Sequence, residues 1–187
     1  MDIKYGSPAR GAFVTNVGLI TSNGPHGHNI MTAEWTFQLS YDPGLIGVSV
    51  GPKKATHANI VATKFFGVGI AAEDQNVLAS IAGNCTGKEV DKIGLLQELG
   101  FNFRKAEHFD LLIPEGCALS AECEVVDQLT CGDHVLFVGK TMNIAHTGKH
   151  PVTYHEGKYW HVGAEIQKPS PEERKRMDAL KEKFKKR

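Results

Sequence analysis

Short apolar runs separated by turns rich in glycine and proline fill most of the chain, and they predict β-strands rather than long helices. The clearest pair alternates apolar and polar residues on both sides of the turn Thr130-Cys131-Gly132-Asp133, which is typical of a β-hairpin. Many short strands without regular strand–helix alternation favour a closed antiparallel barrel, with a β-sandwich as the alternative. The predicted strands cover residues 11–21, 28–40, 45–50, 64–72, 118–129, 134–144 and 159–163.

Helical spacing is confined to a few short segments between these strands. Thr56 is expected to cap a helix that ends near Thr63, and Asp74 to cap a second helix over residues 75–82. A further short helix is expected around 95–99, within an otherwise irregular stretch. In the first helix Ile60 and Val61 should face the core, and the second helix carries the apolar residues Val77, Leu78 and Ile81.

The C-terminal segment has a different pattern. Ser170, Pro171 and Glu173 form the signature of a capping box, and they predict the start of a helix. Residues 170–187 carry eight basic and four acidic side chains, and an apolar stripe follows at helical spacing: Met177, Leu180 and Phe184. We expect this stripe to pack on the same subunit or on a partner. The predicted organisation is therefore a β domain over residues 1–168 and a basic amphipathic helix over 169–187.

Composition narrows the classes of partner. The 187 residues include 21 basic and 21 acidic side chains, so the formal net charge is zero. This balance argues against nucleic-acid and polybasic membrane binding, which need surplus positive charge. The longest apolar runs fall short of the ~20 residues that a membrane span needs, and the first residues lack the pattern of a secretory signal. We expect a cytoplasmic protein without membrane or nucleic-acid partners.

The cysteines follow no recognisable metal or redox spacing. None of Cys85, Cys117, Cys123 and Cys131 forms a C-x-x-C pair, which argues against a zinc ribbon or a thioredoxin-type motif. We interpret them as small apolar residues of a reduced protein, with Cys117 and Cys123 on one face of a strand.

Two nucleotide-binding patterns and one metal pattern are incomplete. Residues 67–72 match G-x-G-x-x-A, but they lie inside an apolar run rather than at a strand-to-helix turn, so the glycines are better explained by tight packing. Residues 83–88 are one residue short of a P-loop and lack its Ser or Thr. His26 and His28 lie in a glycine-rich loop, but zinc needs three or four ligands at fixed spacing, so we expect no metal site.

Two segments point to a phosphorylated ligand. In residues 51–60 a strand end, a tight turn, two lysines and a helix start together suit an anion, although a capped helix beside surface lysines has the same pattern. Residues 29–35 place amide and hydroxyl side chains beside an aromatic residue, which suits the edge of a flat heteroaromatic ring. An amphipathic strand with Trp35 in the core is the alternative.

Taken together, these segments resemble the flavin reductase-like family of FMN-binding split barrels, and among its members the flavoredoxin type. The resemblance runs from about residue 12 to about 163. It depends on the order of N-I-M-T-A-E-W at 29–35, the turn Asp42-Pro43, K-K-A-T-H-A-N at 53–59, V-D-K at 90–92 and G-D-H-V-L-F-V-G at 132–139. It implies a mainly β antiparallel split barrel that binds FMN and forms a homodimer.

The resemblance also implies roles for individual residues. The ring and ribityl chain would contact Asn29, Met31, Thr32, Ala33 and Trp35; the phosphate would be held by Lys53, Lys54, Thr56 and Asn59; and further contacts would come from Lys92, His134 and an aromatic residue of 159–161. Negative charge on the reduced ring needs a cation or a donor nearby, so Lys92 or His134 is expected to favour reduction.

Three functions follow, and the first is preferred. A flavin reductase would pass electrons from NAD(P)H through FMN to free flavin, ferric iron or a partner protein. A flavoredoxin-type carrier would shuttle electrons between proteins without using NAD(P)H directly, a reading favoured by the lack of a motif that recognises the nicotinamide nucleotide. A metal-binding or purely structural β-barrel is the third alternative.

Overall fold

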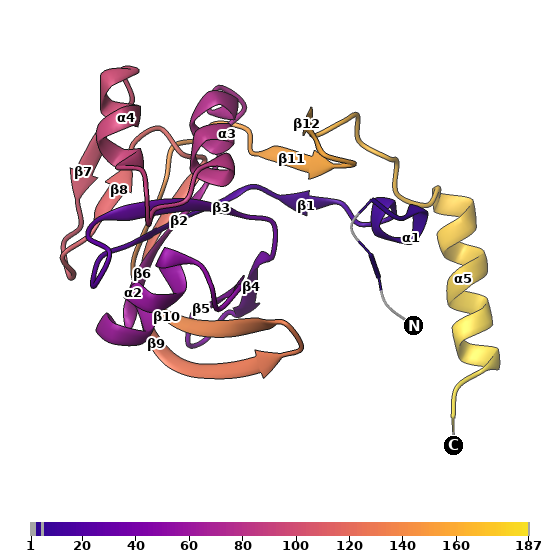
Figure 1. Ribbon diagram of the computed structural model, residues 1–187. Coiled ribbons are helices and arrows are strands. Elements are labelled where there is room, and N and C mark those ends of the chain that lie inside the picture. The colour runs from indigo at the N-terminus through magenta and orange to yellow at the C-terminus, as the bar shows by residue number, and fades with distance from the viewer. Residues whose placement is uncertain (1–2, 5, 187) are drawn as a thin grey trace.

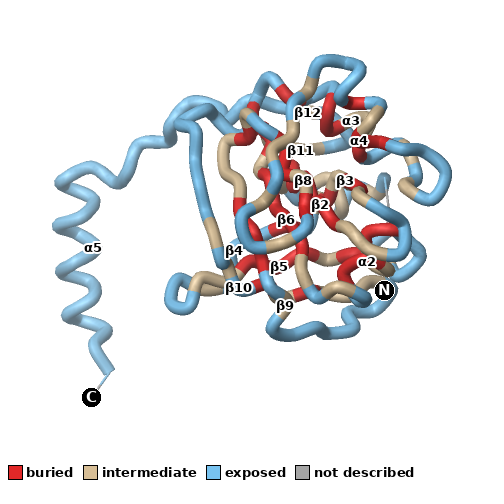
Figure 2. Tube along the Cα trace, turned by 90° about the vertical axis from the view of Figure 1, so that its left-hand side faces the viewer, coloured by how far each residue is buried: buried red, intermediate tan, exposed pale blue. Residues whose placement is uncertain are grey.

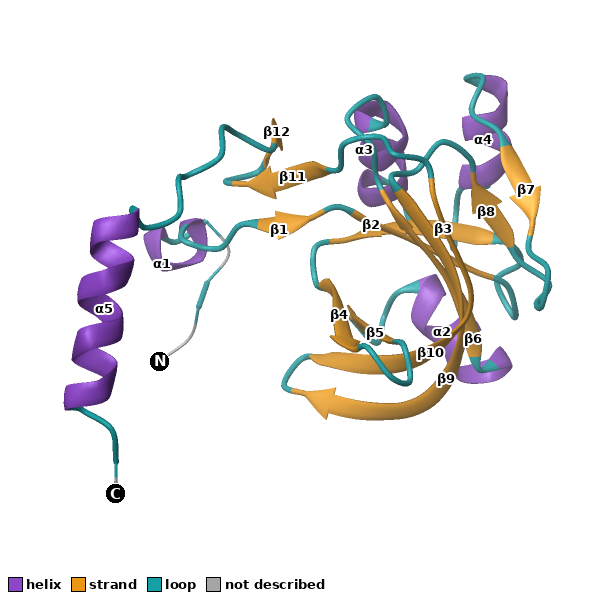
Figure 3. Cartoon of the chain, turned by 180° about the vertical axis from the view of Figure 1, so that it is seen from behind, coloured by secondary structure: helices purple, strands orange, loops and turns teal. Residues whose placement is uncertain are grey.

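The computed structural model describes residues 3–4 and 6–186, and it is dominated by one antiparallel sheet. The strand order is β3-β2-β6-β9-β10-β5-β4, and the sheet curls into an open half-barrel (Figure 3). The predicted mainly β split-barrel class is confirmed. The strands are β2 Gly18–Ser22, β3 Asn29–Ala33, β4 Thr36–Ser40, β5 Leu45–Val50, β6 Phe65–Ile70, β9 Leu119–Cys131 and β10 His134–His146.

Short helices gather at one edge of this sheet. Three of them, α2, α3 and α4, contact β3, so the ends of separate helices meet beside one strand (Figure 1). The helices are α1 Pro8–Gly11, α2 Ala55–Thr63, α3 Asn76–Asn84, α4 Lys92–Glu98 and α5 Pro171–Lys183. Two smaller sheets complete the fold: β1 Thr15–Asn16 with β11 Val152–His155 and β12 Lys158–His161, and β7 Phe103–Lys105 with β8 Leu112–Pro114.

Strand alternation divides the core into two clusters. Along β2, Leu19 packs into the cluster that includes residues of α3 and α4, whereas its neighbour Ile20 packs into the cluster with Phe66 and Phe137. Successive side chains of a strand point to opposite faces, so β2 is buried on both sides. The sheet is therefore held firmly at the point where the helices meet it.

The long strand predicted over residues 28–40 is wrong. The chain breaks at Glu34 and Trp35, because β3 pairs with β2 at one edge of the sheet while β4 pairs with β5 at the opposite edge. The apolar alternation continues through the break, which hides the change of partner. The strand predicted over 11–21 is also interrupted, and its first residue belongs to α1.

The two predicted helix caps are wrong as well. Lys54 is the N-cap of α2, and Thr56 lies inside the helix. The Thr56 hydroxyl accepts a hydrogen bond from the Asn29 side chain. Gln75 is the N-cap of α3, while the Asp74 carboxylate accepts from Lys149 Nζ at 2.5 Å. Of the two residues expected to face inward, Ile60 is buried, but Val61 is 39% exposed.

The C-terminal helix is confirmed, including its capping box, but it has no buried residue. It lies apart from the half-barrel, beyond the extension formed by β1 and β11 (Figures 1 and 2). Its apolar stripe therefore does not pack on its own subunit. In the described part of the chain, no helix is both long and apolar enough to cross a membrane.

All four cysteines are free thiols. The expectation that Cys117 and Cys123 share one strand face is wrong: Cys117 precedes β9 and belongs to the cluster with α3, whereas Cys123 lies in β9 and belongs to the other cluster. Residues at even spacing share a face only when both lie in the same strand, and these two cysteines do not.

Candidate functional site

A polar cavity of about 230 Å³ lies where the N-termini of α2 and α4 approach the C-terminal end of α3 beside β3. It brings together residues that are far apart in the sequence and that the sequence predicts as cofactor contacts: Asn29, Met31, Thr32, Lys54, Thr56 and Lys92. The rest of its lining comes from Ala55 and from 82–87. Two lysines and no acidic residue line it, so within the described structure its charge is uncompensated.

The first turn of α2 supplies backbone donors to this cavity. Lys54 is a helix N-cap without a side-chain hydrogen bond, and its own amide donates to Gly51 O at 3.0 Å across the tight turn. The next residues, Ala55 and Thr56, line the cavity at a point where a helix leaves amide groups unpaired. The positive end of the helix dipole and the Lys54 charge therefore act on the same space, which favours an anion.

A buried side-chain pair forms the inner wall. Asn29 Nδ2 donates to Thr56 Oγ1 at 2.8 Å, and the two residues are 2% and 1% exposed. Because Thr56 accepts this bond, its hydroxyl hydrogen remains available to a ligand. Asn29 Oδ1 has no partner among the described residues, although it is buried. Gly87 lies directly against it, since an added Cβ there would collide with the Asn29 amide.

Lys92 is a buried cation in the same cavity. It is 3% exposed, it begins α4, and its Nζ donates to Ala82 O at 3.0 Å. Burial lowers the pKa of Lys92 to about 8; Lys54 adds to this effect, and the Cys85 thiolate opposes it. No acidic side chain lines the cavity beside this buried cation, so an incoming anion would be stabilised here.

A second cavity of about 310 Å³ adjoins the first and shares Thr32, Gly83 and Asn84 with it. Thr32 Oγ1 donates to Ala79 O at 2.6 Å, so toward a ligand this hydroxyl can only accept. Tyr159 lines the second cavity and its hydroxyl lies 3.3 Å from Ser80 Oγ. Of the residues 159–161, Tyr159 is therefore the one that lines this cavity.

Trp35 and His134 form a separate pair outside both cavities. Their ring centroids are 4.7 Å apart in an edge-on arrangement, and His134 Nδ1 lies 2.8 Å from Asp133 Oδ1. Trp35 is 43% exposed, so it is not the core residue of the alternative interpretation. Both His134 and Lys54 border Gly51, where an added Cβ would meet them at 3.7 and 3.9 Å. Lys54 therefore lies between this pair and the polar cavity.

The remaining predicted residues do not line the cavity. Asn59 is fully buried: its Oδ1 accepts from His26 N at 2.9 Å, and its Nδ2 donates to Gly27 O at 2.9 Å and to Ser22 Oγ at 3.2 Å. This side chain fixes the loop that contains His26 and His28. Ala33 belongs to the core, and Lys53 is exposed in the turn before α2.

Sequence reasoning missed the segment 83–87, which lines the polar cavity. Its resemblance to a P-loop fails on length, but its glycines and small polar residues were a signal of close approach to a ligand. The packing interpretation of the other glycine motif is confirmed, because Gly67 lies inside β6 and an added Cβ would collide with Thr21 and Ile113. Among the described residues, His, Cys, Asp and Glu form no group of three that could hold a metal.

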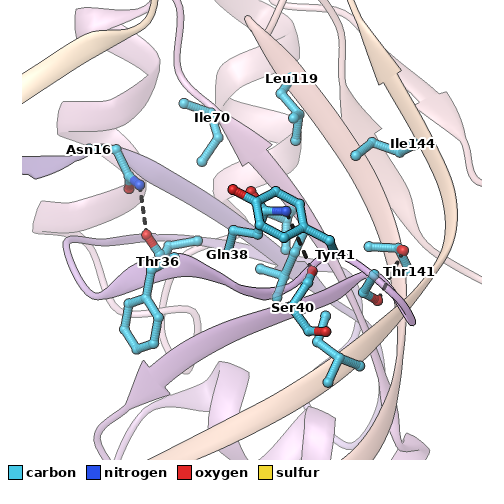
Figure 4. A pocket seen from close by; sticks show the side chains of 14 residues that line it. Asn16, Thr36, Gln38, Ser40, Tyr41, Ile70, Leu119, Thr141 and Ile144 are labelled. Atoms are coloured by element: carbon cyan, nitrogen blue, oxygen red, sulfur yellow. Dashed lines mark hydrogen bonds between the residues drawn. The ribbon is translucent and has the colours of Figure 1, made fainter. Parts of the chain in front are cut away.

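A further cavity of about 430 Å³, with a mainly apolar lining, lies in the mouth of the half-barrel (Figure 4). Its lining comes from β1, β4, β5, β6, β9 and β10 and from the turn between β4 and β5, and includes Tyr41, Ile70, Leu119 and Ile144. It contains no ionisable group other than the Tyr41 hydroxyl, and none of the predicted cofactor contacts.

Comparison with known proteins gives a consistent result. A family model described as flavin reductase like domain matches residues 10–163. An NADH-dependent flavin reductase of Rhodococcus sp. is 27% identical over 158 residues, 81% of each chain. The solved structure of flavin reductase PheA2 is 29% identical, with a TM-score of 0.72, and covers 88% of this chain and 100% of its own.

Further matches extend this result. An FMN-binding protein from Thermus thermophilus shares the fold, with a TM-score of 0.77 at 24% identity over 90% of this chain and 98% of its own. Uncharacterised proteins of Archaeoglobus fulgidus and Pyrococcus abyssi are 30% and 31% identical over 63% and 61% of this chain. These two alignments span 65% and 63% of the relatives' lengths, slightly less than two thirds.

Proposed function

Because the chain belongs to the flavin reductase-like family, we propose that it is an FMN-dependent oxidoreductase that takes electrons from NAD(P)H. The electrons pass to free flavin, ferric iron or a partner protein. The observation that carries this proposal is the polar cavity, in which two lysines and the start of α2 surround a space that no described acidic residue neutralises. A phosphate monoester supplies the missing negative charge.

The residues of the cavity fit FMN in chemistry as well as in charge. Lys54, Lys92 and the hydroxyl of Thr56 are donors, as a phosphate requires. The unpartnered Asn29 Oδ1 and the acceptor side of Thr32 suit N–H and O–H groups of a ribityl chain or ring. We therefore assign the phosphate to the α2–α4 cavity and the ring side of the ligand to the adjoining cavity with Tyr159.

The other predicted contacts receive different roles in this proposal. Asn59 is a positioning residue that fixes the loop next to β3, and Ala33 supports that strand from the core. Trp35 and His134 form an exposed aromatic edge beyond Lys54, suited to a ligand or partner that approaches from that side. Lys53 contributes a more distant, solvated charge.

Bound FMN supplies the two-electron redox chemistry, and the protein supplies placement and charge. Lys92 is the cation buried in the cavity, so of the two residues expected to favour reduction it has the stronger electrostatic effect. The half-exposed His134 lies outside the cavity, where solvent screens its charge. A homodimer that places a second subunit near the aromatic edge is part of the proposal.

The test is steady-state oxidation of NADH and NADPH by the purified protein with excess FMN. Continuous loss of the nicotinamide absorbance, dependent on added FMN, supports a flavin reductase. Tight FMN binding without turnover of either nucleotide would instead identify a carrier of the flavoredoxin type. A protein that does not bind FMN would contradict both.

A further inference from the structure

One nucleophilic side chain of the cavity has no part in the proposed function. Cys85 follows the last turn of α3, is half-buried, and lines the polar cavity together with Lys54 and Lys92. Cys85 therefore shares one cavity with two lysines and with no described acidic side chain. Cationic surroundings and partial exposure are the conditions under which protein thiols react.

The other cysteines lack this combination. Burial raises the pKa of Cys117 to about 11 and that of Cys123 to about 12, and both side chains are inaccessible. Cys131 is exposed at the end of β9 and lines none of the cavities described above. The chain therefore contains one thiol in a cationic cavity, one on the open surface and two buried thiols.

The cavity shows independently that it is built for a ligand. Asn29 is 98% buried and lines the same space, yet its Oδ1 has no hydrogen-bond partner among the described residues. Buried polar atoms are almost always paired, so this atom points to an absent partner. A ligand that meets Asn29, Lys54 and Lys92 also comes next to Cys85.

We propose that Cys85 is a peroxide-reactive thiol whose oxidation competes with cofactor binding in the same cavity. The inference builds on the proposed FMN site. In the reaction the thiolate sulfur attacks one oxygen of a hydroperoxide; the S–O bond forms and the O–O bond breaks. The sulfur loses two electrons, and the released hydroxide or alkoxide takes a proton from water. The resulting sulfenic acid adds an oxygen atom where the phosphate has to lie.

The site of oxidation is tested on the full-length protein with hydrogen peroxide and dimedone, followed by peptide mass spectrometry. We expect dimedone on Cys85 first, with Cys117 and Cys123 unlabelled in the folded protein. Saturating FMN should slow labelling of Cys85 at least tenfold and leave labelling of Cys131 unchanged. Faster oxidation at Cys131, or labelling of Cys85 that FMN does not slow, would overturn the proposal.

The functional consequence is tested by FMN titration before and after peroxide treatment. The parent protein and Cys131→Ser should lose affinity at least tenfold, and a thiol reductant should restore it. Cys85→Ser and Cys85→Ala should show the same affinity before and after treatment, with circular dichroism confirming that they fold. An equal loss in the Cys85 variants would contradict the proposal. Absence of FMN binding in the untreated protein would contradict the proposed function, whereas the labelling order of Cys85 and Cys131 without FMN tests the reactive thiol independently.

Discussion

The polar cavity beside β3 and the cavity in the mouth of the half-barrel differ in both size and chemistry. The cavity at the starts of α2 and α4 is about 230 Å³ and contains two lysines, a free helix start and an unpartnered amide oxygen. The cavity in the mouth of the half-barrel is about 430 Å³ and mainly apolar, with polar but uncharged side chains such as Asn16, Gln38 and Thr141. An apolar cavity is stabilised by any apolar group that covers it, because the hydrophobic effect is not directional. An uncompensated positive charge, in contrast, requires an anion. The smaller cavity is therefore the more informative one.

The largest effect is expected from removing both cations of the polar cavity. The double variant Lys54→Met, Lys92→Met should weaken FMN binding more than about 100-fold, since each hydrogen bond to a charged group contributes about 1.5–3 kcal/mol. Isothermal titration measures the change. Lys140→Met, on an exposed position of β10, is the matched control and should bind FMN like the parent. A similar loss in both variants would show that general charge, and not the cavity, is responsible.

The single substitution Lys92→Met should affect FMN binding and the stability of the fold in different ways. The pKa of Lys92 is lower in the folded state than in the unfolded chain, so the unfolded chain holds more protons between about pH 8 and 10.5. The charged form of Lys92 therefore destabilises the fold below about pH 8, and this penalty disappears as the pH rises through that window. Lys92→Met should keep or raise the free energy of unfolding at pH 7. A clear decrease in urea denaturation would contradict the account.

FMN affinity should also depend on pH through Lys92. Because the anion prefers the ammonium form, affinity should be level near pH 7 and fall up to tenfold per unit above about pH 8. Lys54 and Cys85 share the cavity and shift this midpoint, so the control replaces Lys92 alone. In Lys92→Arg the charge persists, so the fall of affinity above about pH 8 should be clearly smaller than in the parent. An unchanged profile would exclude Lys92 as the titrating group.

A smaller effect is expected at Thr56. Thr56→Val keeps the shape but removes the hydroxyl that accepts from Asn29, and we expect about a tenfold loss of FMN affinity and a modest loss of stability. Thr56→Ser restores the hydroxyl and should bind within about threefold of the parent. Fluorescence titration of FMN distinguishes them; equal affinities for the Val and Ser variants would remove Thr56 from the site.

The smallest effect is expected in the apolar cavity. Ile144→Ser changes a lining residue far from any predicted cofactor contact, so FMN affinity should stay within about twofold of the parent. A large loss of affinity would mean that the mouth of the half-barrel, and not the α2–α4 cavity, receives the flavin. Circular dichroism at equal concentration checks that the variant is folded.

Local patterns predicted the parts of this molecule that local forces decide. The hairpin β9–β10, the strand β5 and the capped helix α5 follow directly from alternation, turn residues and a capping box. The break at Glu34 and Trp35 was missed because only pairing with distant strands separates β3 from β4. The helix caps were missed because both candidate residues have partners far away in the sequence. The Thr56 hydroxyl accepts a hydrogen bond from Asn29, 27 residues away, and the Asp74 carboxylate accepts one from Lys149.

The same distinction applies to the candidate site. The sequence pointed to residues on β3 and on the first turn of α2 because each group lies in a local motif, the first suited to the edge of a flat ring and the second to an anion. The glycines and small polar residues of 83–87 were a signal of close approach to a ligand, but the place of this segment in the cavity could not be predicted, since it depends on the packing of α3 against β3. The burial of Lys92 likewise depends on the placement of α4. The alternating charges near residue 91 gave no indication that this lysine is buried.

The most direct measurement compares FMN with riboflavin, which lacks only the phosphate, in the parent and in the Lys54→Met, Lys92→Met variant. The account predicts that the parent prefers FMN at least 100-fold and that the double variant binds both ligands with similar, weak affinity. A variant that keeps the full preference for FMN would show that the phosphate is held elsewhere, and would contradict the central claim.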